Sequence, residues 1–111
     1  MSDLFISNTC IFSLFHGQRN QPIAEFIEHT SEVTQVAFSK SSQHRAFSAS
    51  LDKTFRVYDI ASKCTLKSIM APSPINRMAI DLIEANVYLA CDNQNVYAYS
   101  LEILPNNLNG N

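Results

Sequence analysis

The residues best suited to covalent chemistry in this 111-residue chain are Ser48, His29 and Asp52. A serine becomes a nucleophile when a histidine takes its proton and a carboxylate orients that histidine. Such a serine usually lies on a sharp turn between a strand and a helix, beside an oxyanion-binding loop. The sequence around Ser48 has neither feature, so we expect no catalytic residue. A small hydrolase using these three residues is the alternative from the enzyme class.

The remaining reactive residue types are not spaced for a metal ion or a cofactor. The histidines are His16, His29 and His44, and the cysteines are Cys10, Cys64 and Cys91. The histidines lack metal-ligand spacing, and no two cysteines form a C-x-x-C motif. An odd number of cysteines, all in apolar runs, favours free thiols in a reducing compartment. With only two glycines there is no phosphate-binding loop, and we expect neither a metal nor a cofactor.

Composition limits the chain to one domain or part of one. It is 46% hydrophobic, with seven Phe and four Tyr, and can therefore form a core. A net charge of −2 leaves no basic excess to neutralise phosphates, so we expect no direct binding of nucleic acid. No apolar run approaches about 18 residues, which argues against a membrane helix. The N-terminal residues also lack the basic and apolar regions of a secretory signal.

Short alternating segments predict β-strands rather than helices. Four strands separated by polar turns are expected at 34–38, 45–50, 54–60 and 64–70. The series resumes at 77–82, 86–91 and 95–101, and an earlier third and fourth strand are expected at 11–14 and 23–27. Tyr58-Asp59-Ile60 precedes Tyr99-Ser100-Leu101 by 41 residues. A period of about 40–45 residues with four strands is typical of a β-propeller blade.

Residues 23–70 resemble one repeat of the WD40 family. The resemblance depends on Glu28-His29-Thr30, where the family usually has Gly-His, on Ser48-Ala49-Ser50-Leu51-Asp52, and on Tyr58-Asp59, where it has Trp-Asp. It implies an all-β, partial WD40 β-propeller of about two to two and a half four-stranded antiparallel blades. The expected divisions are an N-terminal segment at 1–9, a propeller part at 10–104 and a disordered, Asn-rich tail at 105–111. Within the propeller part the units are 10–27, 28–70 and 71–104. Because a closed propeller needs 4–8 blades, we expect a fragment or one piece of a larger assembly.

The resemblance also implies a structural tetrad. In blades of this family a His, a Ser or Thr, an Asp and a Trp form a buried hydrogen-bonded chain, which here corresponds to His29, Ser48, Asp52 and Tyr58. Asp52 is expected to accept from His29 and from amides of its own turn. Tyr58 replaces the Trp and can close the chain through its hydroxyl. In unit 71–104, Leu89 and Asn93 stand at the Ser48 and Asp52 positions, so packing must stabilise that blade.

A narrower resemblance points to the Ipi3-type WD-repeat subunit of the nuclear complex that processes precursors of the large ribosomal subunit. It depends on the strand at 11–14, the Ser50-Leu51-Asp52 turn and the segment 74–81. It implies a non-enzymatic scaffold in the nucleus, in the nucleolus or nucleoplasm, that binds other protein subunits and pre-60S particles. The alternative is a WD40 adaptor in a ubiquitin-ligase, transport or signalling complex, and the alternative location is the cytoplasm. Glu32, Lys53 and Arg77 lie near loops of one expected rim and are candidate partner contacts.

Overall fold

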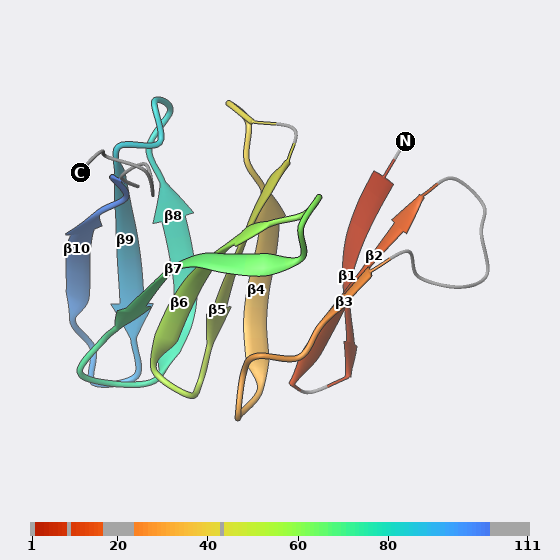
Figure 1. Ribbon diagram of the computed structural model, residues 1–111. Coiled ribbons are helices and arrows are strands. Elements are labelled where there is room, and N and C mark those ends of the chain that lie inside the picture. The colour runs from red at the N-terminus through yellow and green to blue at the C-terminus, as the bar shows by residue number, and fades with distance from the viewer. Residues whose placement is uncertain (1, 9, 17–23, 43, 103–111) are drawn as a thin grey trace, which may run out of the picture.

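The computed structural model describes residues 2–8, 10–16, 24–42 and 44–102 (Figure 1). Within these ranges the secondary structure is entirely β. The strands are β1 (Ser2–Asn8), β2 (Ile11–His16), β3 (Ala24–Phe26), β4 (Val33–Phe38), β5 (Arg45–Ser50), β6 (Thr54–Asp59), β7 (Cys64–Met70), β8 (Ile75–Ile80), β9 (Asn86–Cys91) and β10 (Val96–Ser100). In the described part of the chain, no helix has the length and apolar character that crossing a bilayer requires.

The strands form three antiparallel sheets that stand side by side (Figure 1). The first sheet has the order β1-β2-β3, the second β4-β5-β6-β7 and the third β10-β9-β8. Strand β4 begins the second sheet and lies next to both β1 and β8. Each sheet is a meander of consecutive strands, as the sequence repeat predicts. This arrangement confirms the all-β fold of a partial propeller.

Two elements differ from the strands expected from the sequence. The N-terminal segment 1–9, for which no strand is predicted, contains β1, which pairs with β2 and belongs to the first sheet. The strand expected at 77–82 is β8 and begins two residues earlier, at Ile75. The register of its pairing with β9 shifts between Ile75 and Arg77. This bulge interrupts the alternation of buried and exposed residues from which the start of a strand is predicted. The expected tail at 105–111 lies outside the described residues.

The second and third sheets use the same tight turn between their second and third strands. Lys53 has φ 77° and Gln94 has φ 70°, and these residues are 41 positions apart. The Lys53 amide donates to Ser50 O at 3.2 Å, and the Gln94 amide donates to Cys91 O at 3.1 Å. The left-handed conformation costs a non-glycine residue energy, so its recurrence shows that the turn geometry is part of the repeat.

Two hydrophobic cores lie between the sheets. The core between the first and second sheets contains Phe12, Leu14, Ala24, Phe26 and Tyr58. The larger core, between the second and third sheets, contains Phe47, Ala49, Phe55, Val57, Ile69, Ala71, Ile75, Met78, Val87, Leu89, Cys91 and Leu101. Each large apolar side chain enclosed there contributes about 1.5–3 kcal/mol. Face-to-face burial between neighbouring sheets is therefore the main force that orders them.

Polar contacts fix the second and third sheets in register. Thr34 Oγ1 on β4 donates to Ile75 O on β8 at 2.9 Å. The Met78 amide on β8 donates to Gln35 Oε1 on β4 at 2.8 Å. Because both bonds join the first strands of the two sheets, β4 and β8 are held at a defined separation.

Candidate functional site

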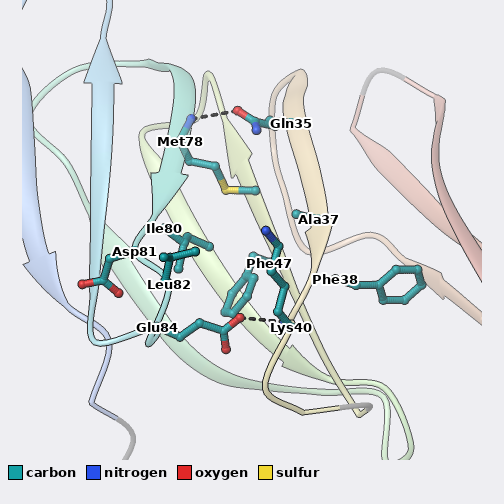
Figure 2. A pocket seen from close by; sticks show the side chains of 10 residues that line it. All are labelled: Gln35, Ala37, Phe38, Lys40, Phe47, Met78, Ile80, Asp81, Leu82 and Glu84. Carbon is teal, nitrogen blue, oxygen red and sulfur yellow. Dashed lines mark hydrogen bonds between the residues drawn. The ribbon is translucent and has the colours of Figure 1, made fainter.

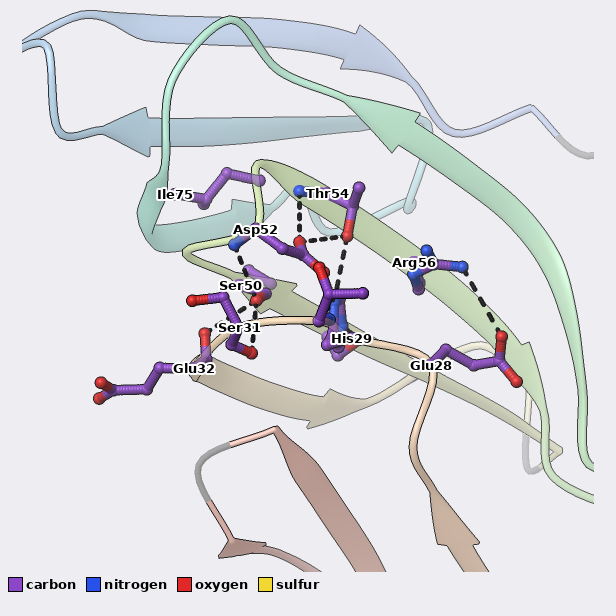
Figure 3. A network of polar contacts seen from close by, with 12 residues as sticks. Glu28, His29, Ser31, Glu32, Ser50, Asp52, Thr54, Arg56 and Ile75 are labelled. Carbon is purple, nitrogen blue, oxygen red and sulfur yellow. Dashed lines mark hydrogen bonds and ion pairs between the residues drawn. The ribbon is translucent and has the colours of Figure 1, made fainter.

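Hydrogen bonds join the four residues of the expected tetrad within the second sheet, and Figure 3 shows two of them, His29 and Asp52, beside Thr54. His29 lies in the connection from β3 to β4, Ser48 on β5, Asp52 in the β5–β6 turn and Tyr58 on β6. His29 Nδ1 is 2.9 Å from Asp52 Oδ2, and His29 Nε2 is 2.6 Å from Ser48 Oγ. The hydroxyls of Ser48 and Tyr58 are hydrogen-bonded at 3.3 Å. Strand pairing and the tight turn thus bring together residues 29 positions apart in the sequence.

Asp52 is the acceptor on which this chain of hydrogen bonds ends. Its Oδ2 accepts from His29 and from the Thr30 amide at 3.1 Å. Its Oδ1 accepts from the amide and the hydroxyl of Thr54, with the amide at 2.8 Å. Burial alone would raise the pKa of Asp52, but the bonds from Thr54, His29 and Thr30 outweigh burial and lower that pKa to about 2. The group is therefore a carboxylate at neutral pH.

His29 is a neutral imidazole with a fixed tautomer. Its burial lowers the pKa, and this effect exceeds the opposing hydrogen bond and charge of Asp52. A carboxylate cannot donate, so Nδ1 holds the proton that faces Asp52. Nε2 is then the acceptor of a hydrogen bond that the Ser48 hydroxyl donates. Both ring nitrogens are satisfied, as a buried polar group requires.

Tyr58 joins the polar chain to the first sheet. Its hydroxyl meets Ser48, while its ring packs edge-on against Phe12 at 5.2 Å between centroids and tilted against Phe26 at 5.0 Å. Only 1% of the side chain is exposed, and burial raises the pKa of its hydroxyl to about 12. One side chain therefore ends the hydrogen-bonded chain and fills the core between two sheets.

A weak ion pair borders this network. Arg56 Nη1 on β6 lies 4.0 Å from Glu28 Oε1, and half of the Glu28 side chain is exposed (Figure 3). Among the described residues, Arg56 Nε is a buried atom without a hydrogen-bond partner. Such an exposed pair contributes about 0–1 kcal/mol, so the stability of the site comes from the buried chain.

The burial of Ser48 speaks against the hydrolase alternative. The distances between Ser48, His29 and Asp52 match those of a nucleophile, a base and an orienting acid. However, Ser48 is 0% exposed and His29 is 4% exposed. A serine hydroxyl enclosed between strands has no open path to a substrate. The same geometry serves to link β4, β5 and β6.

Two polar residues beside Asp52 belong to the network but are not predicted from the sequence. Ser50 Oγ donates to Glu32 O at 2.8 Å, and it accepts from the Asp52 amide at 3.0 Å. Thr54 Oγ1 is 3.1 Å from His29 Nδ1 and also bonds Asp52. The available signal is the Ser-x-Asp-x-Thr spacing, since short hydroxyl side chains next to a turn tend to bond the backbone.

The third sheet keeps the turn and lacks the histidine chain. Asn93 Oδ1 accepts from the Asn95 amide at 3.1 Å, as Asp52 Oδ1 accepts from Thr54. Asn93 Nδ2 donates to the hydroxyl of Tyr97 at 2.9 Å. Leu89 is fully buried in the larger core. An apolar side chain therefore replaces the serine, and the turn alone remains polar.

The candidate partner contacts occupy two different places. Glu32 and Lys53 are exposed at the same end of the second sheet, where the Leu51 amide donates to Glu32 O at 2.8 Å. Arg77 is exposed but lies within β8, opposite Ala90, rather than in a loop. The structure thus brings Glu32 and Lys53 together and places Arg77 on a sheet face.

The other histidines and the cysteines form no site in the described residues. His44 is exposed, and the side chain of His16 lies outside the described part. Cys91 is buried, but Cys64 is exposed at the start of β7, contrary to the expectation of an apolar setting. Among the described residues no group of three or more His, Cys, Asp or Glu side chains is placed to hold a metal ion.

Stacked antiparallel sheets with a repeated turn define this chain as part of a β-propeller protein. Residues 20–59 match the family described as WD domain, G-beta repeat. The fold is similar to the crystal structure of the C-terminal WD40 domain of Sif2, with a TM-score of 0.78 and 18% identity over 88% of this chain and 28% of that chain. Residues 20–59 are therefore identified as one WD40 repeat within this partial propeller.

One curated relative extends the comparison beyond the fold. The chain is 29% identical over 85 residues to the Pre-rRNA-processing protein IPI3 of Yarrowia lipolytica (strain CLIB 122 / E 150). The match covers 73% of this chain and 20% of that protein. The chain thus spans about a fifth of the length of the curated relative it matches.

Proposed function

We propose that this chain is a non-enzymatic scaffold that holds protein subunits together in pre-rRNA processing for the large ribosomal subunit. WD40 repeats form protein-interaction domains, and the second blade has the buried network that makes such a domain rigid. The observation that supports the specific process is the similarity to the pre-rRNA-processing protein over 73% of the chain. On this proposal the protein acts in the nucleus and binds pre-60S particles through other proteins.

The geometry of the second sheet supports a scaffold because its potentially reactive side chains are buried and hydrogen-bonded to one another. Asp52, His29 and Ser48 bond one another inside the blade. The exposed ends of the same elements remain available for contact, and Glu32 and Lys53 lie there. We propose these two residues and Arg77 as contacts to partner proteins. A rigid blade lowers the entropy lost when such loops bind.

Affinity capture from nuclear extract tests the proposal. The tagged full chain is expected to enrich large-subunit assembly factors, measured by mass spectrometry, and spacer-containing precursor RNA, measured by quantitative PCR. Capture of the proteins should survive ribonuclease treatment, because the chain has no basic excess to bind RNA directly. Exchanging two charges, Glu32→Lys with Lys53→Glu, should reduce the enrichment, while Lys63→Glu in the distant β6–β7 turn should not.

The same experiment separates the alternatives. Recovery of a ubiquitin-ligase, transport or signalling complex without pre-ribosomal proteins would support the WD40 adaptor instead. A fluorescent fusion confined to the cytoplasm would also count against a nuclear role. Labelling of Ser48 by a fluorophosphonate would favour the hydrolase, because only an accessible and activated serine reacts.

A further inference from the structure

A carboxylate of the third sheet is hydrogen-bonded to a loop of the second sheet. Glu84, in the turn between β8 and β9, accepts from the Lys40 amide at 2.7 Å (Figure 2). It also accepts from Ser39 Oγ at 2.6 Å and from the Ser41 hydroxyl. All three donors lie in the loop that follows β4. Glu84 and these donors, which we call the Glu84 clasp, therefore join two neighbouring sheets through one side chain.

The turn that carries Glu84 is held in a conformation that costs energy. Glu84 has φ 56°, in the left-handed region that residues other than glycine seldom adopt. Its amide donates to Asp81 O at 2.9 Å, and Asp81 Oδ1 accepts from the Ala85 amide at 2.7 Å. Strained backbone persists where surrounding contacts fix it, and it is concentrated at functional positions. The strain at Glu84 thus points to a role for its side chain.

The clasp borders a cleft between the second and third sheets (Figure 2). The cleft has a volume of about 180 Å³, and its walls come from β4, β5, β8 and the turn that follows β8. Figure 2 shows the Lys40 side chain directed away from the Glu84 carboxylate, and among the described side chains no ion pair joins these two residues. The charge of Glu84 is therefore balanced by donors of the loop and not by a cation.

Glu84 is ionised at neutral pH. Its burial raises the pKa, but the bonds from Ser39, Ser41 and Lys40 outweigh burial and lower that pKa below its usual value. A carboxylate can only accept, so each group that the loop contributes to the clasp must be a donor. The contact between the two sheets is therefore weakened when one of these donors becomes an anion.

Ser41 is the donor of the clasp that an enzyme can reach. Ser41 is exposed, whereas Ser39 is half-buried. Ser39 Oγ also accepts from the Ser41 amide at 3.2 Å and from the Ser42 amide at 3.0 Å, so its own loop encloses it. The remaining donor, the Lys40 amide, is a backbone group. A reversible modification of the clasp therefore falls on the Ser41 hydroxyl.

We propose that Ser41 is phosphorylated by a protein kinase, and that the phosphate releases the loop from Glu84. In this transfer Ser41 Oγ forms a bond to the γ-phosphorus of ATP, the kinase takes the hydroxyl proton, and ADP leaves. The product lacks the donor that bonds Glu84 and carries a charge of about −1.5 to −2 at neutral pH. Loss of the bond and repulsion of the carboxylate act in the same direction. The second and third sheets should then separate more easily beside the cleft, while the Asp52 turn, at the other end of β5, keeps its bonds.

Hydrogen exchange of the full chain with phosphoserine in place of Ser41 tests the release. The Lys40 amide should exchange at least about tenfold faster than in the unmodified chain, because it loses a hydrogen bond to a charged group. Phosphoserine in place of Ser62 is the matched control. Ser62 is exposed, and its amide and hydroxyl also donate to a carboxylate, that of Asp59, but within one turn of the second sheet. The control should leave the Lys40 rate unchanged, and an unchanged rate with phosphate on Ser41 would refute the proposal.

Glu84→Gln separates repulsion from the loss of a donor. Glutamine keeps an acceptor oxygen but has no charge, and its amide group can donate to a phosphate. In this background the phosphate should change the Lys40 rate by less than about threefold, so the two changes are not additive. Equal acceleration in both backgrounds would show that Glu84 does not respond to the phosphate. The Leu51 amide, which donates to Glu32 O, should keep its rate throughout, and its acceleration together with Lys40 would indicate unfolding of the sheet and contradict local release.

Occupancy of the site is tested on the full chain isolated from eukaryotic cells with phosphatase inhibitors present. Mass spectrometry should find phosphate on Ser41 and not on the buried Ser48 or Ser50, and the modified peptide should be absent from Ser41→Ala. An unmodified Ser41 would overturn the proposal. The inference goes beyond the proposed function and uses no capture of partners. Its failure therefore leaves the role in pre-rRNA processing untouched, and failure of the capture experiment leaves the clasp untouched.

Discussion

Replacing Asp52 with Ala is the most direct test of the buried network. The carboxylate accepts from His29, from Thr30 and twice from Thr54, and the substitution removes all four of these hydrogen bonds. The exposed Thr30 amide can bond water instead. The buried His29 Nδ1 is left with the Thr54 hydroxyl, 3.1 Å away, in place of the carboxylate. Loss of a hydrogen bond to a charged group costs about 1.5–3 kcal/mol. Together with the weakened turn, we expect a loss of about 2–3 kcal/mol.

Urea unfolding followed by circular dichroism measures this loss. With a slope of about 1–3 kcal/mol per molar for a small protein, the midpoint should fall by about 0.7–3 M. Asp92→Ala is the matched control, because Asp92 lies in the equivalent turn of the third sheet and is exposed. Its amide donates to Pro74 O, and among the described residues its carboxylate has no hydrogen-bond partner. Its unfolding should change by less than about 0.5 kcal/mol. Equal midpoints for Asp52→Ala and the unaltered protein would refute the network argument.

The pH dependence of the same difference supplies a second check. The pKa of Asp52 is lowered from 3.8 to about 2, so the unfolded chain binds the proton first as the pH falls. The stabilisation by Asp52 is therefore complete above pH 4 and is lost as the pH falls toward 2. The gap between the unaltered protein and Asp52→Ala should close over that interval. A gap that stays constant would show that the carboxylate charge is not what stabilises the turn.

Three further substitutions test separate parts of the structure. The buried, neutral His29 should make stability fall as the pH drops below 6.5, because the unfolded imidazole is protonated first; pH-dependent melting of His29→Gln should lack this slope. Tyr58→Phe should cost about 0.5–1.5 kcal/mol and Tyr58→Ala about 3–5 kcal/mol by urea unfolding, because only Ala opens a cavity beside Phe12; equal costs would contradict the packing role. Glu84→Gln should speed hydrogen exchange of the Lys40 amide about fivefold, and an unchanged rate would show that this bond is dispensable.

The strands rich in β-branched and aromatic residues could be predicted from the sequence, because these residue types favour strands. In β6, Thr54, Phe55, Val57 and Tyr58 are buried, and the β-branched and aromatic residues mark the strand. β1 could not be predicted in this way, because its strand depends on pairing with β2. The predicted start of β8 was two residues too late, because a bulge interrupts the two-residue period there.

The candidate site could also be predicted only in part, because some of its features depend on a local sequence pattern and others depend on how the sheets stack. The positions of His29, Ser48, Asp52 and Tyr58 follow from a family pattern, and the bonds between them agree with it. The cleft could not be predicted, because its walls come from β4 and β8, whose separation depends on how two sheets stack. No spacing within one repeat contains that information.

Burial decides what a serine, a histidine and an aspartate do together. The bonds at Ser48, His29 and Asp52 are short enough for proton transfer in an enzyme, but catalysis also needs an open face where a substrate carbonyl can approach the serine. Here that face is covered by Tyr58, whose hydroxyl takes the remaining contact of Ser48. Since the aromatic ring of Tyr58 also fills the core between two sheets, opening the serine would require separating those sheets. The network therefore couples the turn at Asp52 to the packing of the first sheet, and a substitution at either end should weaken both.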